Sequence, residues 1–176
     1  MELWRKYFGE SAQIFAVDIN RECEQLKQSN VGIFIGSQSD PIFLQDISEK
    51  MPMLDIIIDD GGHTMDQQKI SFEHLFHKLK DGGIYLIEDT HTSYWYEYKG
   101  GYKSRNSFIE YSKNVIDSLY EWHIPEVSRV KSNEITKNIN CVAFFDSIIV
   151  FEKKLRDKPF DIQKGTKTIL LILTRP

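Results

Sequence analysis

The sequence predicts an α/β protein with a doubly wound, Rossmann-like and mostly parallel sheet that ends in an antiparallel hairpin. Short apolar runs alternate with amphipathic stretches of helical length, which is typical of strands alternating with helices. The run at residues 54–58 is apolar except for Asp55, which fits a parallel strand buried on both faces. Residues 141–153 hold two apolar runs separated by Asp146-Ser147, which predicts the closing hairpin.

The composition excludes several classes of protein. The 176 residues, 41% of them hydrophobic and 27% charged, suffice for one domain with a buried core. A net charge of −4 without a basic stripe argues against a nucleic-acid partner. Cys23 and Cys141 stand far apart, which argues against a disulfide framework and a zinc site. Because no apolar run has the length of a membrane span or a signal peptide, we expect a cytoplasmic protein without membrane contact.

The first half of the chain should contain five segments that alternate between helix and strand. They are a helix over residues 2–8, a strand over 13–19, a polar helix over 21–28, a strand over 31–35 and a helix over 41–50. Gly9 is a stop for the first helix, and Asp40-Pro41 is typical of a helix start. Asp18 ends the first strand, which is the commonest place for an acid that holds a ribose.

The central unit, residues 54–89, should consist of a strand, a loop, a helix, a turn and a second strand. Its first strand leads into Asp59-Asp60-Gly61-Gly62-His63, and Thr64 can cap the next helix. One face of that helix is formed by Met65, Gln68, Phe72, Leu75, Phe76 and Leu79. Asp81-Gly82-Gly83 should end the helix in a left-handed stop before a strand at residues 84–87.

After the central unit, the aromatic and glycine-rich segment 90–106 is too long for a plain connection. An amphipathic helix over 107–122 should follow it, before the closing hairpin. We divide the chain into an α/β domain over residues 1–153 and a region over 154–176. That second region is a charged linker with a short apolar run at 168–174, for which the sequence suggests no partner.

Four carboxylates and a histidine follow the two strands of the central unit. Asp59, Asp60 and His63 come after the first strand, and Glu88 and Asp89 come after the second. The carboxyl ends of parallel strands share one edge, so these side chains should lie close together. Asp60, Glu88 and Asp89 offer hard oxygen donors, which favour Mg²⁺, Mn²⁺ or Ca²⁺ over zinc. His63 beside such a cation is a candidate general base. Any one acid could instead be a cap, but their convergence favours a site.

His91 and the aromatic residues that follow it form a second candidate group. His91 could lie beside the metal or contact a substrate. Tyr94 and Trp95 belong to a run of aromatic residues that could stack on a sugar or a flat acceptor ring, or could pack over the sheet edge. We therefore keep His91, Tyr94 and Trp95 as candidate substrate contacts.

The stretch IDDGGHTMDQQKISFEHLF, followed by LKDGGIYLIEDTHTSYW, resembles class I S-adenosylmethionine-dependent methyltransferases of the macrolide-sugar O-methyltransferase type. The Asp-Asp-Gly-x-His loop and the later Glu-Asp pair are specific when they occur together. The resemblance covers roughly residues 1–153. It implies S-adenosylmethionine and Mg²⁺ as cofactors, a small-molecule acceptor such as a sugar hydroxyl, and a place in natural product biosynthesis.

The resemblance also implies a role for each candidate residue. His63 would be the catalytic base. The metal ligands would be Asp60, Glu88 and Asp89. The cofactor would contact Asp18 through its ribose, Gln38 through its adenine, and Asp59 in the loop before His63.

One part of the family pattern has no counterpart in this sequence: the strand and glycine-rich loop that would precede the helix at residues 2–8. That strand would lie between those at 13–19 and 54–59, which would otherwise expose apolar edges. An N-terminally truncated chain, a homo-oligomer or a fold-back of residues 168–174 would each account for this. Two functions stay open: a metal-dependent O-methyltransferase acting on a sugar or other polyhydroxylated small molecule, and a catalytically inactive methyltransferase-like fragment that serves for binding or assembly.

Overall fold

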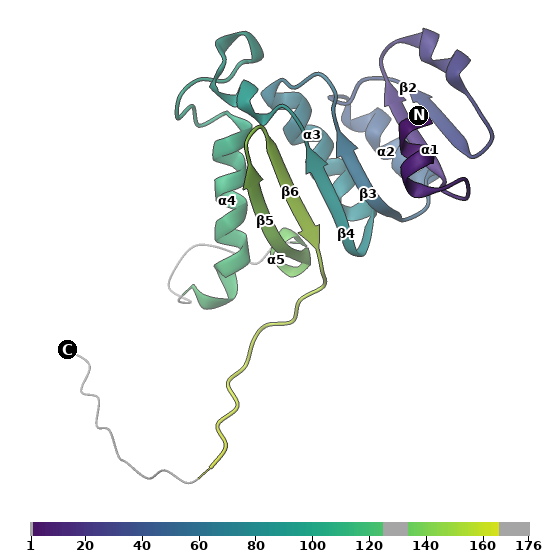
Figure 1. Cartoon of the computed structure of the whole chain (residues 1–176). Helices are drawn as coiled ribbons and strands as arrows, with labels where there is room; N and C mark the ends of the chain where they lie inside the picture. The colour runs from purple at the N-terminus through teal and green to yellow at the C-terminus, as the bar shows by residue number, and fades with distance from the viewer. Residues whose placement is uncertain (1, 125–133, 166–176) are drawn as a thin grey trace.

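The computed structural model describes residues 2–124 and 134–165, in which helices and strands alternate along most of the chain (Figure 1). The α-helices are α1 (Glu2–Phe8), α2 (Pro41–Lys50), α3 (Met65–Leu75), α4 (Phe108–Tyr120) and α5 (Glu134–Asn138). The strands are β1 (Ile14–Asp18), β2 (Val31–Ile35), β3 (Leu54–Asp59), β4 (Leu79–Ile87), β5 (Ile139–Phe145) and β6 (Ile148–Lys153). Short 3₁₀ helices cover Arg21–Leu26, Phe76–Lys78, Thr90–Tyr94, Tyr96–Tyr98 and Glu121–His123.

The described strands form two sheets. β1 and β2 make a parallel pair. The larger sheet has the order β3-β4-β6-β5, in which β3 and β4 are parallel and β6 runs antiparallel to both of its neighbours. The predicted α/β architecture, with parallel strands first and an antiparallel hairpin last, is confirmed.

Between the two sheets, the described residues contain no hydrogen-bonded pairing of β1 with β3, at the place where the sequence pattern lacks a strand. Figure 1 shows the β1–β2 pair on one side of β3, and β4, β6 and β5 in that order on the other side. Val17 in β1 and Ile56 in β3 keep 37% and 40% of their surface exposed. Each of these two strands therefore leaves an apolar side chain in contact with solvent.

The core lies between the larger sheet and the helices α2, α3 and α4. In Figure 1, α2 and α3 lie behind the strands, and their buried faces join one apolar cluster with side chains of the sheet. Phe72 of α3 is fully buried, and its ring centroid lies 4.4 Å from that of Phe151, 5.0 Å from that of Phe76 and 5.2 Å from that of Tyr85. The predicted apolar face of α3 thus packs on the sheet. This packing fixes the position of the loop that leads into the helix.

The predicted end of α3 was wrong. The helix ends at Leu75, a 3₁₀ turn follows, and Leu79 already belongs to β4, where it is fully buried opposite Leu54 of β3. Gly82 has φ 80° inside the strand, beside a shift in the register of β3 against β4. A glycine with positive φ serves a helix stop and an irregular strand equally well, so the sequence pattern alone did not separate the two.

The remaining predicted segments differ from the structure in smaller ways. The polar segment 21–28 forms a 3₁₀ helix over Arg21–Leu26 rather than an α-helix. Residues 154–165 form neither helix nor strand, and the apolar run at 168–174 lies outside the described residues. Within residues 2–124 and 134–165, no helix has both the length and the apolar character that crossing a bilayer requires.

Candidate active site

Two loops meet where β3 and β4 end. Because these strands are parallel neighbours, the residues that follow each of them emerge at the same edge of the sheet. The backbone N–H of Glu88 donates to the carbonyl oxygen of Asp59 at 2.9 Å, so the two loops start side by side. The first loop carries Asp60 and His63, and the second carries Asp89.

Asp60, His63 and Asp89 converge on one point. Each offers one ligand atom, and these atoms all lie within 4.8 Å of one another. His63 Nε2 lies 3.5 Å from Asp89 Oδ2 and 3.9 Å from Asp60 Oδ1. Both carboxylates are partly exposed, so a solvated ion can reach them. Two of the three predicted metal ligands, Asp60 and Asp89, thus lie together beside the predicted base, and hard oxygen donors of this kind suit Mg²⁺ or Mn²⁺. Their binding of a cation stays a prediction.

An uncommon backbone conformation places both loops. His63 has φ 56° and Asp89 has φ 51°, in the left-handed region that is uncommon for residues other than glycine, although asparagine, aspartate and histidine enter it more often than most. The hydroxyl of Thr92 lies 2.9 Å from the carbonyl oxygen of His63 and 2.8 Å from that of Asp89, and its single proton is shared between these two acceptors. These bonds tie the two loops together. Conformations of this kind persist where the surrounding structure imposes them, and they are frequent at functional sites.

Glu88, the third predicted metal ligand, is not part of the three-residue cluster, but the charges of Asp60 and Asp89 affect its pKa. Its pKa is raised, first by burial and then by the carboxylates of Asp60 and Asp89. Carboxylates that repel one another in this way gain stability when a cation joins them. The role of Glu88 as a ligand stays a prediction.

Asp59 lies inside the protein, with 8% of its surface exposed. Its Oδ1 accepts a hydrogen bond from Gln38 Nε2 at 2.9 Å, and its Oδ2 accepts one from the hydroxyl of Ser71. Burial raises the pKa of Asp59, and these two hydrogen bonds oppose that rise. Both Gln38 and Asp59 were predicted to contact the cofactor. The structure places them against each other, and their cofactor contacts stay predictions.

Sequence reasoning missed the polar side chains of α3 that hold the two loops. Ser71 donates to Asp59, and Gln68 Nε2 donates to the carbonyl oxygen of Glu88 at 3.1 Å. Gln67 Oε1 accepts from the backbone N–H of Thr64 at the start of the helix, at 3.2 Å. Gln68 and Ser71 are buried on the otherwise apolar face of α3. Polar residues on a buried helix face require partners, and this was the signal available in the sequence.

Asp18 ends β1 in the smaller sheet. Its Oδ1 accepts a hydrogen bond from the backbone N–H of Asn20 at 2.8 Å. This bond, together with a weaker one from Cys23, lowers the pKa of Asp18. The carbonyl oxygen of Asp18 accepts from the N–H of Gly36, so the loop after β1 lies beside the loop that carries Gln38. The predicted contact of Asp18 with a ribose stays a prediction.

His91, Tyr94 and Trp95 begin the aromatic segment after β4. His91 Nδ1 lies 3.8 Å from Asp89 Oδ1, and its ring meets the edge of Trp95 with centroids 4.7 Å apart. Tyr94 and Trp95 keep 48% and 47% of their surface exposed. His91 and Trp95 therefore border the cluster, and the predicted substrate contacts stay predictions.

The parallel strands, with carboxylates and a histidine where they end, agree with the resemblance to class I methyltransferases. No known family model matches the chain. It is 35% identical over 131 residues to 8-demethyl-8-(2-methoxy-alpha-L-rhamnosyl)-tetracenomycin-C 3'-O-methyltransferase of Streptomyces olivaceus, covering 72% of this chain and 33% of the relative. It is 27% identical over 155 residues to 8-demethyl-8-alpha-L-rhamnosyl tetracenomycin-C 2'-O-methyltransferase of the same organism, covering 88% of this chain and 40% of the relative.

The fold agrees with these similarities. The structure of MycE methyltransferase from the mycinamycin biosynthetic pathway, in complex with Mg and SAH, matches with a TM-score of 0.82 and 26% identity. The match covers 93% of this chain and 43% of that one. The predicted resemblance is thereby confirmed, and the chain is a macrolide-sugar O-methyltransferase-like protein. It spans about a third to two fifths of the length of the two relatives.

Proposed function

We propose that the chain takes part in S-adenosylmethionine- and Mg²⁺-dependent O-methylation of a sugar hydroxyl, or of another polyhydroxylated small molecule. One observation carries this proposal: Asp60, His63 and Asp89 converge at the carboxyl ends of two parallel strands. It is supported by relatives named as O-methyltransferases of rhamnosyl compounds and by a similar structure that contains Mg and SAH.

In this proposal, Asp60 and Asp89 hold the cation, with Glu88 as the further carboxylate beside them. Mg²⁺ held by these carboxylates would lower the pKa of an acceptor hydroxyl bound beside it. His63 then accepts the hydroxyl proton. S-adenosylmethionine would supply the methyl group, whose bond to sulfur would break as the acceptor oxygen bonds to the methyl carbon. The contribution of the protein is to align these three atoms and to exclude water.

Titration calorimetry with S-adenosylmethionine, with and without Mg²⁺, tests the proposal on the full chain. Cofactor binding, followed by Mg²⁺-dependent formation of S-adenosylhomocysteine with deoxysugar glycosides as acceptors, is the expected result. The second candidate, a catalytically inactive methyltransferase-like fragment, is favoured by the lack of strand pairing between β1 and β3 in the described part of the chain. Absence of binding heat at millimolar cofactor in both conditions would establish that second candidate and contradict the first.

Asp89→Asn should weaken cation binding on the order of 100-fold, because it removes a charged oxygen donor from the cluster. Asparagine tolerates the left-handed backbone of Asp89, so the fold should persist. The affinity for Mn²⁺, measured by electron paramagnetic resonance, checks this. The matched control is Asp55→Asn, which removes the same charge from an exposed residue paired with Lys80. Equal Mn²⁺ affinities in the two variants would rule out Asp89 as a ligand.

A further inference from the structure

Gln38 connects the two sheets at the candidate site. It follows β2 of the smaller sheet, whereas the groups that it contacts, Asp59 and Gly62, belong to the end of β3 and the loop after it in the larger sheet. The two sheets share no strand pairing in the described residues, so this side chain is one of the polar links that join them.

Both ends of the Gln38 amide are used. Its Nε2 donates to Asp59 Oδ1 at 2.9 Å, and its Oε1 accepts from the backbone N–H of Gly62 at 2.7 Å. Turning the amide over would place its oxygen against a carboxylate and its NH₂ group against an N–H. The two partners thus define one orientation, in which Gln38 holds the start and the middle of the loop.

The loop backbone lies directly against this amide. A Cβ atom placed on Gly61 would come within 1.9 Å of Gln38 Oε1, so a larger residue at position 61 would displace the glutamine. Asp59 also accepts a hydrogen bond through its other carboxylate oxygen, Oδ2, from the hydroxyl of Ser71 in α3. Asp60 and His63 therefore lie on a loop that is held at two points. Asp59, just before the loop, is hydrogen-bonded to Gln38 and Ser71, and Gly62 within the loop is hydrogen-bonded to Gln38.

We propose that Gln38 is a positioning residue, which holds Asp60 and His63 in their converged arrangement before a cation binds. This inference rests on the proposed function, because it assumes that the converged donors serve a cation. The positioning role is separate from the predicted contact of Gln38 with the cofactor, because it depends on the hydrogen bonds to Asp59 and Gly62 alone. Residues that orient metal ligands through hydrogen bonds typically change metal affinity about 10–100-fold when replaced.

Two replacements separate the polar contacts from packing. Gln38→Ala removes the side chain, and Gln38→Met keeps its length and volume but neither hydrogen bond. Both should weaken Mn²⁺ binding about 10–100-fold in the full chain. Both should also speed solvent exchange of the Gly62 amide about tenfold in the metal-free protein, as followed by nuclear magnetic resonance.

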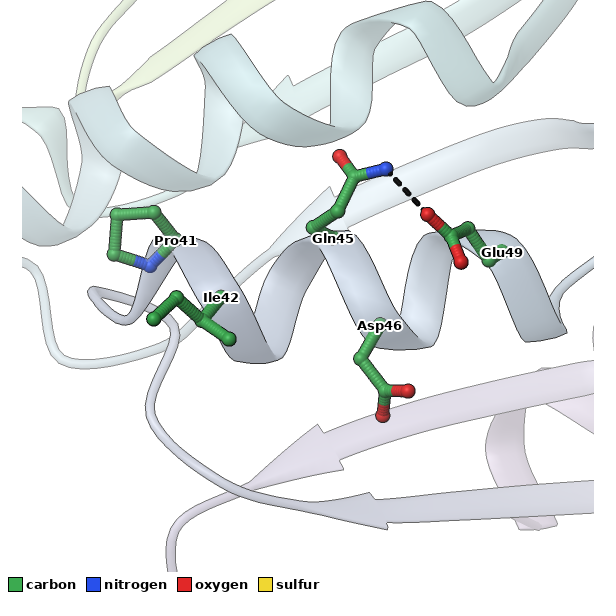
Figure 2. Close-up of a pocket in the computed structure, with 5 residues that line it drawn as sticks. All are labelled: Pro41, Ile42, Gln45, Asp46 and Glu49. Carbon is green, nitrogen blue, oxygen red and sulfur yellow. Dashed lines mark hydrogen bonds between the residues drawn. The ribbon is translucent and has the colours of Figure 1, made fainter.

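The matched control is Gln45→Ala on the outer face of α2. Gln45 lines a surface hollow together with Pro41, Ile42, Asp46 and Glu49, which Figure 2 draws as sticks. Its Nε2 donates to Glu49 Oε1 at 2.7 Å. None of these residues belongs to the candidate site. Gln45→Ala should therefore leave both the Mn²⁺ affinity and the Gly62 exchange rate unchanged.

The outcomes distinguish this inference from the proposed function. If both Gln38 variants bind Mn²⁺ within about threefold of the unmodified chain, with unchanged Gly62 exchange, the positioning role is overturned while the cation site stands. If the unmodified chain binds no Mn²⁺, the proposed function fails, and the Gly62 exchange rates alone then decide whether Gln38 holds the loop.

Discussion

His63→Asn is expected to lower the rate of methyl transfer by about 10²–10⁴-fold, which is the usual contribution of a general base. Asparagine is the suitable replacement because it tolerates the left-handed backbone at φ 56°, whereas alanine would add strain. The Mn²⁺ affinity should stay within about threefold of the unmodified chain if His63 moves a proton and does not bind the metal. The measurement is Mg²⁺-dependent formation of S-adenosylhomocysteine, together with Mn²⁺ binding.

Turnover and Mn²⁺ affinity, measured together, distinguish the two roles that the geometry allows His63, general base and metal ligand. His63 Nε2 lies 3.5 Å from Asp89 Oδ2, close enough for the ring to serve either as a base or as a third ligand. A loss of Mn²⁺ affinity similar to that of Asp89→Asn would make His63 a ligand, and retained turnover would remove it as the base. The control is His77→Asn, at an exposed histidine that follows α3, away from both loops.

Phe72→Ala is expected to lower the free energy of unfolding by about 3–5 kcal/mol, which is the usual cost of deleting a fully buried aromatic side chain. Phe72 is fully buried, and its ring packs against aromatic rings of α4 and of the strands β4 and β6. The cavity left behind would remove contacts on each of these elements. Urea unfolding, extrapolated to water, provides the measurement.

Phe160→Ala is the control for this substitution, because Phe160 keeps 81% of its surface exposed. Its effect on the unfolding free energy should stay within about 0.5 kcal/mol. If Phe72→Ala cost no more than the control, Phe72 would not be the centre of the core.

The order of the elements was predictable because apolar runs and helix signals agree along most of the chain. β2 and α2 begin and end where the sequence patterns place them, and Thr64 caps α3 as expected. The end of α3 was not predictable, because Leu79 suits a buried helix face and a buried strand equally well. Its pairing with Leu54 decides the matter, and that contact is made only in the folded chain.

The residues of the candidate site were predictable because acids and a histidine followed two apolar strands. Asp60, His63 and Asp89 come together as the strand-end pattern implies. Their support was not predictable in the same way. Gln38 reaches Gly62 from 24 positions away along the chain, and no spacing rule joins a loop of one sheet to a loop of another.

The attachment of both loops to α3 has a consequence for the motions of the protein. Ser71 holds the loop after β3, and Gln68 holds the loop after β4, so the two loops depend on the same helical turns. Local unfolding proceeds in cooperative units whose members share an opening free energy. The loops should therefore open as one unit when the turns of α3 that carry Gln68 and Ser71 unwind.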